Sequence, residues 1–286
     1  MVRAGYGVRG SLRIRESLLQ WGAQTYVMGI VNVTPDSFSG DGLENALAAS
    51  AHAIAQRHAG ADILDVGGES TRPGHQPVDE AVEIGRIVPV ICGVRAKLPN
   101  VPISIDSYKP NVVRAACEAG ADVINSVWGL PDDVLEIAAE YRMPVVAMHN
   151  QRGTDYDGAA SDAVVRFLED CAKRAVARGI PPEAIVLDPG IGFGKTADQN
   201  VEVLQRLDRI VALGFPTMIG TSRKSTIGKL TGREPVDRIY GTAASTALAI
   251  AAGIDMVRVH DVAAARDACA VADAIVRDWR PAEWTQ

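Results

Sequence analysis

Polar side chains recur where apolar, strand-like runs end along this 286-residue chain. They are Asn32, Asp65, Asp106, Asn125, Asp188, Ser222, Arg258 and His260. In a barrel of parallel strands, the carboxyl ends of the strands form one mouth, where the loops build the active site. We therefore expect these side chains to gather at a single site.

Two acids and an amide in this set, Asp106, Asn125 and Asp188, could recognise a heterocycle rich in N–H groups, such as an amino-pyrimidinone ring. Buried carboxylates are costly unless they are paired or accept hydrogen bonds, and such a ring supplies donors. The alternative is that each side chain caps a loop by accepting from backbone amides. That alternative is weaker for the three together than for any one alone.

A second set is cationic and comprises Arg72, Lys224, Arg258 and His260. Alternate strand residues face the same side, so Arg258 and His260 point together and the neighbouring valines point toward the helices. Cations that converge on one cleft indicate phosphate or diphosphate. The stretch TSRKS (221–225) precedes a helix, whose N-terminal N–H groups favour anions. The alternatives are an edge strand and a loop with solvated charges.

The stretch GIGFGKT (190–196) looks like a phosphate-binding loop but matches neither common pattern. The P-loop needs glycine where Pro189 stands, and the dinucleotide fingerprint needs glycine where Lys195 stands. Lys195 could as easily be a solvated loop charge.

The five histidines lack HExxH spacing and no GxSxG elbow occurs, which argues against a zinc hydrolase and an α/β-hydrolase.

The elements that must position these residues form eight strand–helix units. The strand-like runs are 26–33, 62–68, 102–107, 123–127, 144–150, 184–190, 216–222 and 256–262. Helix-like runs follow them at 43–59, 79–97, after Pro110, and at 131–141, 161–178, 198–213, 225–230 with 236–252, and near the C-terminus. Most strands are apolar on both faces, as in a parallel sheet covered by helices.

Eight such units in about 260 residues predict a single (β/α)8 TIM barrel, an α/β fold. The domain spans 26–280 after a short N-terminal extension, 1–25. A doubly wound open sheet is the alternative, and periodicity alone does not exclude it. The polar strand ends favour the barrel.

Composition narrows the class of protein further. The net charge of −6 argues against a nucleic-acid partner. The four cysteines are scattered, with no metal-ligand spacing, which favours free thiols in a reducing compartment. We see neither a secretory leader nor an apolar run of about 20 residues, and therefore expect a cytoplasmic protein that does not enter membranes.

Six motifs, in order, resemble those of the dihydropteroate synthase family. They are MGIVNVTPDSFSGDG (28–42), DVGGESTRPG (65–74), SIDSYKP (104–110), LDPGIGFGK (187–195), TSRKS (221–225) and RVHD (258–261). The resemblance covers about 26–275. It implies that 4-aminobenzoate is joined to 6-hydroxymethyl-7,8-dihydropterin diphosphate, giving 7,8-dihydropteroate and diphosphate in folate biosynthesis. It also implies a sulfonamide target, although sensitivity to the drugs cannot be read from sequence.

The same resemblance implies the site residues. Those that bind the pterin would be Asp106, Asn125, Met148, Asp188, Lys224 and Arg258. Those that bind diphosphate would be Asn32, Arg258 and His260, with Asn32 as the protein contact of Mg²⁺. Those of the aminobenzoate side and the two covering loops would be Asp36, Phe38, Thr71, Arg72, Pro73, Phe193 and Ser225. Lys224, Arg258 and His260 would be the catalytic residues.

One residue departs from the family pattern: Ser126 follows Asn125 where aspartate is common. By strand alternation Ser126 points away from Asn125, so we expect a change behind the pocket and an intact pterin contact. A pterin-dependent methyltransferase and a non-catalytic pterin-binding paralogue are the alternatives; the cations favour the synthase. The resemblance also implies a homodimer.

Overall fold

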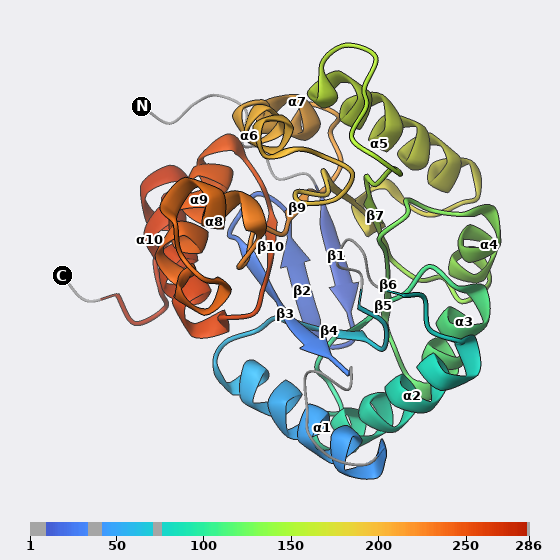
Figure 1. The fold of residues 1–286 in the computed structure, drawn as a ribbon. Helices are drawn as coiled ribbons and strands as arrows, with labels where there is room; N and C mark the ends of the chain where they lie inside the picture. Colours follow the sequence, from blue (N-terminus) through green and yellow to red (C-terminus); the bar gives the residue numbers. More distant parts are fainter. Residues whose placement is uncertain (1–9, 34–41, 71–75, 285–286) are drawn as a thin grey trace.

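Eight parallel strands form a nearly closed barrel surrounded by helices in the computed structural model, which describes residues 10–33, 42–70 and 76–284 (Figure 1). The strands are β3 (Tyr26–Asn32), β4 (Ile63–Gly67), β5 (Ile103–Asp106), β6 (Val123–Ser126), β7 (Val145–Met148), β8 (Ile185–Asp188), β9 (Met218–Ile219) and β10 (Met256–Val259). Their hydrogen-bonded order is β8-β7-β6-β5-β4-β3-β10-β9, and a bridge between Leu187 and Thr217 joins the two ends. The predicted TIM barrel is confirmed, and the open sheet is excluded.

The helices follow the strands as predicted, with one difference. They are α1 (Gly42–His58), α2 (Glu80–Lys97), α3 (Pro110–Ala119), α4 (Asp132–Glu140), α5 (Ala160–Ala177), α6 (Ala197–Gln205), α7 (Leu207–Val211), α8 (Ser225–Thr231), α9 (Ile239–Ala252) and α10 (Val262–Val276). The run expected to be one helix at 198–213 is two, because Arg206, at φ −119° and ψ 23°, leaves the helical region between them. Among the described residues, none of the helices has the length and apolarity needed to cross a membrane.

Strand alternation divides the core into two parts. Val27, Leu64 and Val257 belong to the larger cluster, which the strands share with the surrounding helices. Their direct neighbours in the chain, including Met28, Ile63 and Met256, point the other way and fill the amino-terminal part of the barrel interior. The inward direction then continues along each strand to the polar residues at its carboxyl end.

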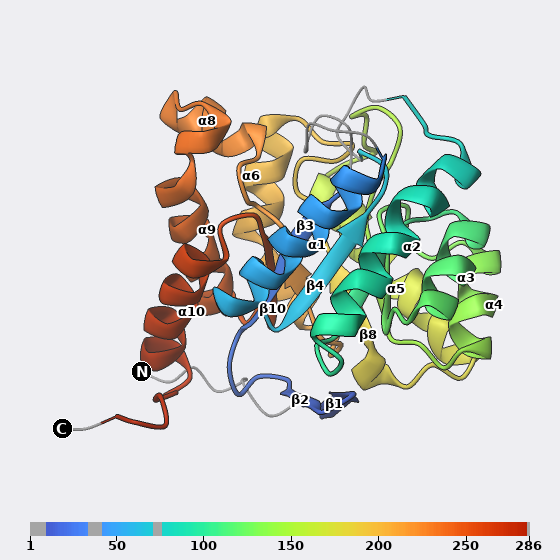
Figure 2. The same cartoon turned by 90° about the horizontal axis from the view of Figure 1, so that it is seen from below.

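A hairpin of β1 (Ser11–Ile14) and β2 (Ser17–Gln20) lies across the amino-terminal end of the barrel (Figure 2). Ile14, Leu19 and Trp21 join the interior cluster from below. Trp21 is fully buried, and its indole nitrogen donates to the Glu183 carbonyl at 2.8 Å. The segment that the sequence left without a role thus contributes the floor of the barrel.

A recurrent glycine–x–aspartate unit links helices to strands at this amino-terminal end. Gly60, Gly120 and Gly253 all have φ of +105°, a conformation that favours glycine and ends helices. Two residues later, Asp62, Asp122 and Asp255 accept the backbone N–H groups of Val27, Ile103 and Thr217 in neighbouring strand segments. The repeat is hard to recognise in the sequence because its three copies are widely and unequally spaced.

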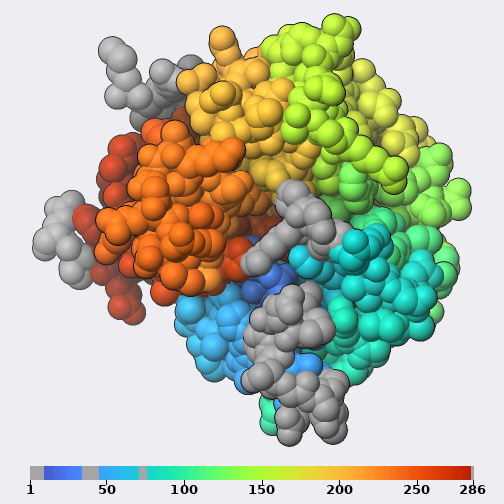
Figure 3. All heavy atoms as spheres, in the orientation of Figure 1, coloured from blue at the N-terminus to red at the C-terminus, as the bar shows by residue number. Residues whose placement is uncertain are grey.

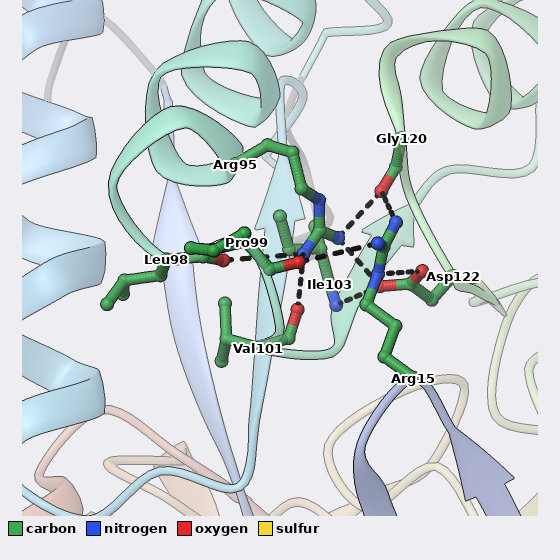
Figure 4. A network of polar contacts seen from close by, with 8 residues as sticks. All are labelled: Arg15, Arg95, Leu98, Pro99, Val101, Ile103, Gly120 and Asp122. Atoms are coloured by element: carbon green, nitrogen blue, oxygen red, sulfur yellow. Dashed lines mark hydrogen bonds and ion pairs between the residues drawn. The ribbon is translucent and has the colours of Figure 1, made fainter.

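Asp122 is also the centre of the polar network that holds the hairpin in place (Figure 4). Its Oδ1 accepts from Arg15 Nε at 2.6 Å, and its Oδ2 accepts from Arg95 Nη2 at 2.7 Å. Both arginines also donate to backbone carbonyls at the ends of α2 and α3, including that of Gly120. The network therefore joins the hairpin, two helices and two strands.

Candidate active site

The carboxyl ends of the strands surround a cavity at the barrel mouth, and Figure 3 shows this face hollowed near its centre. The cavity is lined by Ile30, Asn125, Val127, Met148, Asp188, Phe193, Gly220, Ser222, Lys224, Arg258 and His260. Eight of the residues selected from the sequence are among them, from five strands and the loops that follow. Arg258 and His260 both enter the mouth, as strand alternation predicted.

Arg258 connects the acids of this site. Its Nε donates to Asp65 Oδ2 at 2.6 Å and its Nη2 donates to Asp106 Oδ2 at 2.7 Å. Asn125 Nδ2 donates to the same Asp65 oxygen at 3.0 Å. Four side chains from β4, β5, β6 and β10 are therefore held as one unit.

Burial gives this unit unusual electrostatics. Burial, with Asp65 adding to it, raises the pKa of Asp106 from its ordinary 3.8 to about 7, although Arg258 opposes the shift. For Arg258, burial alone would lower the pKa, but Asp65 and Asp106 outweigh it and hold the pKa above its ordinary value. Within the described residues, Asp65 Oδ1 and Asp106 Oδ1 are buried without a hydrogen-bond partner. Such atoms indicate acceptors available to a ligand.

Asp188 and Lys224 occupy the neighbouring part of the cavity. Asp188 Oδ1 accepts from the Gly190 N–H at 2.7 Å, and burial raises the pKa of Asp188 while Lys224 opposes that shift. Burial lowers the pKa of Lys224 to about 8, with Asp188 acting in the other direction. Lys224 Nζ donates to the Ile191 carbonyl and lies 4.5 Å from the centroid of the Phe193 ring.

The glycines of GIGFGKT allow the loop after β8 to fold against its neighbours. Gly190 and Gly194 have φ of +67° and +55°. A Cβ atom at Gly190 would lie 1.9 Å from the His149 carbonyl oxygen, and one at Gly194 would lie 2.6 Å from the Gln151 carbonyl oxygen. These glycines therefore allow the loop backbone beside Asp188 to lie close to the backbone at His149 and Gln151. This close approach explains a glycine-rich motif that matches no nucleotide-binding loop.

His260 is oriented by Ser222. The Ser222 hydroxyl lies 3.0 Å from His260 Nδ1, and it also accepts from the His260 backbone N–H at 3.1 Å. The pairing fixes the direction of an imidazole that shares its strand face with Arg258.

Other predicted residues lie outside this cluster. Asn32 is partly exposed at the end of β3, and Ser225 is exposed as the first residue of α8; neither lines the cavity. Ser126 is fully buried, as expected for a side chain opposite Asn125. The predicted loop residues Asp36, Phe38, Thr71, Arg72 and Pro73 lie outside the described residues.

Two residues near the site were missed or misread from sequence. Asp65 was recognised as a strand-end acid but received no role, because its bonds to Arg258 and Asn125 span long stretches of chain. The strand parity shared with Asp106 was the available signal. Lys195 was read as a possible solvated charge; it is buried, with 8% of its surface exposed.

Comparison with known proteins defines the class first. The family described as pterin binding enzyme matches residues 28–260. A dihydropteroate synthase of Clostridium beijerinckii is 45% identical over 260 residues, which cover 90% of this chain and 96% of the relative. One from Synechocystis is 43% identical over 280 residues, which cover 94% and 95%. The chain belongs to the dihydropteroate synthase family of pterin-binding enzymes.

Solved structures agree in fold. A dihydropteroate synthase from Clostridium difficile, solved in the presence of pteroic acid, has a TM-score of 0.87 and 47% identity over 90% of this chain and 98% of its own. One from Xanthomonas albilineans with 4-aminobenzoic acid has a TM-score of 0.86 and 43% identity over 92% and 96%. The same enzyme in complex with 7,8-dihydropteroate has a TM-score of 0.85 and 40% identity over 95% and 100%.

Proposed function

We propose that this chain joins 4-aminobenzoate to 6-hydroxymethyl-7,8-dihydropterin diphosphate, releasing 7,8-dihydropteroate and diphosphate. It is then a transferase of folate biosynthesis. The observation that carries the proposal is the arrangement of the cavity, where acids able to accept from a pterin stand beside Arg258, Lys224 and His260. Names of relatives with nearly full coverage support the same reaction.

The acids and amides would recognise the pterin. Asp188 would accept from its 2-amino group and ring N–H, and Asp106 and Asn125 would supply further polar contacts. Met148, 5% exposed and on the cavity wall, would pack on the flat ring. A ring that donates to these carboxylates offsets the cost of burying them.

The cations would stabilise the leaving group. Cleavage of the C–O bond leaves a resonance-stabilised pterin cation and places negative charge on diphosphate, toward which Arg258 and His260 would donate. The aminobenzoate nitrogen then forms the C–N bond and releases a proton. Because the cation is stabilised by the pterin itself, no covalent enzyme intermediate is required.

We also propose that Mg²⁺ assists, with Asn32 as its protein contact. The described residues contain no group of three or more His, Cys, Asp or Glu side chains able to hold a metal. Asn32 is a partly exposed residue, and its amide oxygen suits an ion whose other ligands are phosphate oxygens and water, as Mg²⁺ prefers. When bound, the ion would neutralise charge on the diphosphate.

The aminobenzoate would lie beside Phe193, with its carboxylate toward Ser225 at the start of α8. Ser225 is exposed at this helix N-terminus, where backbone N–H groups favour an anion. Asp36, Phe38, Thr71, Arg72 and Pro73 would contribute from the two loops assigned by the family motifs. This assignment would make the site a sulfonamide target, since a neighbour from Yersinia pestis is described in complex with a sulfonamide drug.

A homodimer is a further part of the proposal. Helices α8 to α10 and the loop between α8 and α9 expose large apolar side chains, with Leu230, Tyr240, Leu248 and Ile275 at 71–86% exposure. Exposed large apolar side chains gathered on neighbouring elements are typical of protein interfaces. Light scattering should give twice the 30.3 kDa chain mass.

Four free cysteines support a cytoplasmic location.

Diphosphate release with both substrates and Mg²⁺ tests the reaction, and growth of a synthase-deficient strain tests it in cells. The proposed function predicts that the chain releases diphosphate in the assay and that it restores growth of the strain. A non-catalytic paralogue would bind a pterin analogue without releasing diphosphate, and a pterin-dependent methyltransferase would not need the diphosphate. Pterin binding without product formation would therefore overturn the proposal.

A further inference from the structure

Lys195 is a buried lysine beneath the aminobenzoate side of the site. Its Nζ lies 2.9 Å from His149 Nδ1 and donates to the carbonyls of Gly190 and Phe193, each at 3.0 Å. An ammonium has three N–H donors, so these three acceptors satisfy it completely. None of them is a carboxylate. The ammonium is therefore held by hydrogen bonds to the 190–195 loop and to His149, which follows β7, and the charge of the Asp188 carboxylate also favours its protonated form.

His149 is fixed as an acceptor for this lysine. Burial, and then the charge of Lys195, lower the pKa of His149 to about 3, so the imidazole is neutral. When Lys195 is charged, Nδ1 must accept and the ring hydrogen lies on Nε2. The His149 ring packs edge-on against the Phe167 ring, with 5.0 Å between the ring centroids, and stacks with the Tyr156 ring, with 6.1 Å between the centroids.

The loop that Lys195 closes carries two groups of the proposed site. Phe193 lies below the Lys224 ammonium, and the Ile191 carbonyl accepts from the same ammonium. The Tyr156 hydroxyl donates to the Gly194 carbonyl at 2.7 Å and holds the loop from another side. A change at Lys195 would therefore reach Phe193 and Lys224 through the loop backbone.

We propose that Lys195 is a positioning residue: its ammonium closes the 190–195 loop and so sets where Phe193 meets the aminobenzoate. Burial lowers the pKa of Lys195 to about 7, which shows that a cation is costly at this position. An uncharged side chain would avoid that cost but could not bind three acceptors at once. The inference rests on the proposed function, because it uses Phe193 as a wall for the second substrate.

The test is a separation of kinetic constants in the full-length enzyme. Lys195→Met keeps an apolar stem and removes all three hydrogen bonds. We expect the KM for 4-aminobenzoate to rise about tenfold or more, as for loss of charge-assisted hydrogen bonds. We expect the Kd of a non-reactive pterin analogue to change by a smaller factor, because the strand-end residues Asp188 and Asn125 keep their positions and, of the proposed pterin contacts, Lys224 is the one that contacts the loop. Lys229→Met, an exposed lysine on α8, is the matched control and should change neither.

Two substitutions at His149 sharpen the test. His149→Asn places an amide oxygen near the position of Nδ1 and should keep a low KM, whereas His149→Leu removes the acceptor and should raise the KM. Lys195→Met combined with His149→Leu should cost less than the sum of the two. If Lys195→Met does not fold, the two His149 variants decide the proposal.

Two results would overturn the inference. One is a folded Lys195→Met enzyme with unchanged aminobenzoate KM; the other is a loss confined to kcat, as expected from a smaller active fraction. Failure of the proposed function looks different, because the unmodified chain itself would then release no diphosphate.

Discussion

The two ends of the barrel both place aspartates beside arginines, but the hydrogen-bonding capacity of these aspartates is filled at one end and not at the other. At the amino-terminal end, both oxygens of Asp122 are bound, by Arg15, by Arg95 and by the Ile103 N–H (Figure 4). At the mouth, Asp65 and Asp106 each keep one buried oxygen that binds nothing in the described part of the chain. The same pair of residue types thus forms a complete network at one end and an incomplete one at the other.

The difference separates stability from function. A complete network stabilises the fold, while an unsatisfied buried acceptor has a cost that a ligand can remove. In TIM barrels the amino-terminal face serves stability and the carboxyl-terminal face serves catalysis. Substitutions at the base should therefore change unfolding, and those at the mouth should change turnover.

The largest effect is expected for Arg258→Ala. Arg258 joins Asp65 to Asp106 and is the delocalised cation on the proposed diphosphate side. Loss of one preorganised charge-stabilising donor lowers kcat by about 10²–10³. Diphosphate release should fall by at least that factor, and Arg258→Lys should recover only part of it, because an ammonium cannot reproduce the guanidinium fork.

His260→Ala is the comparison for that variant. An imidazole supplies one directed donor where guanidinium supplies several, so its loss should be smaller. Near-normal turnover of Arg258→Ala would mean that this strand face does not meet the leaving group.

At the base, Asp122→Ala should act on stability alone. It removes the shared acceptor of Arg15, Arg95 and the Ile103 N–H, leaving Arg95 largely buried without its carboxylate. Removing one partner of a fully buried pair costs about 3–5 kcal/mol, and the partial exposure of Asp122 and Arg15 places this case below that range. Urea unfolding measures the loss.

The kinetic constants of the folded Asp122→Ala enzyme should match those of the unmodified chain. A changed aminobenzoate or pterin KM would mean that the two ends of the barrel are coupled, against the separation argued above.

A third prediction concerns pH. The pKa of Asp106 is raised from 3.8 to about 7 in the folded chain, chiefly by burial. Between about pH 4 and 7 the folded state keeps a proton that the unfolded state releases, so this group makes stability fall as pH rises through that window. Asp106→Asn should flatten the decline.

Unfolding free energies of both proteins at several pH values between 4 and 8 measure this effect. The difference between the two curves isolates Asp106 from Asp188 and Asp273, whose pKa values burial also raises. Parallel curves would show that Asp106 titrates normally.

The same contrast explains what could be read from sequence. Strand periodicity predicted all eight units, and alternation placed Arg258 and His260 on one inward face, because both follow from local geometry. The partnership of Asp65 with Arg258 joins residues 193 positions apart, and neither spacing nor composition encodes it. Lys195 was misread for a similar reason: its acceptor His149 follows β7 and lies 46 positions away in the sequence.

The smallest effect is expected for Ser126→Ala. Ser126 is fully buried opposite Asn125, and its hydroxyl has no hydrogen-bond partner among the described residues. Removing a buried hydroxyl that binds nothing should change the free energy of unfolding by about 0.5 kcal/mol or less, in either direction. The Kd of a pterin analogue should not change, since the side chain faces away from the cavity. Calorimetry and urea unfolding on the same preparation measure both quantities. A loss of pterin affinity would place Ser126 in contact with the site and contradict the strand alternation on which the whole reading of the mouth depends.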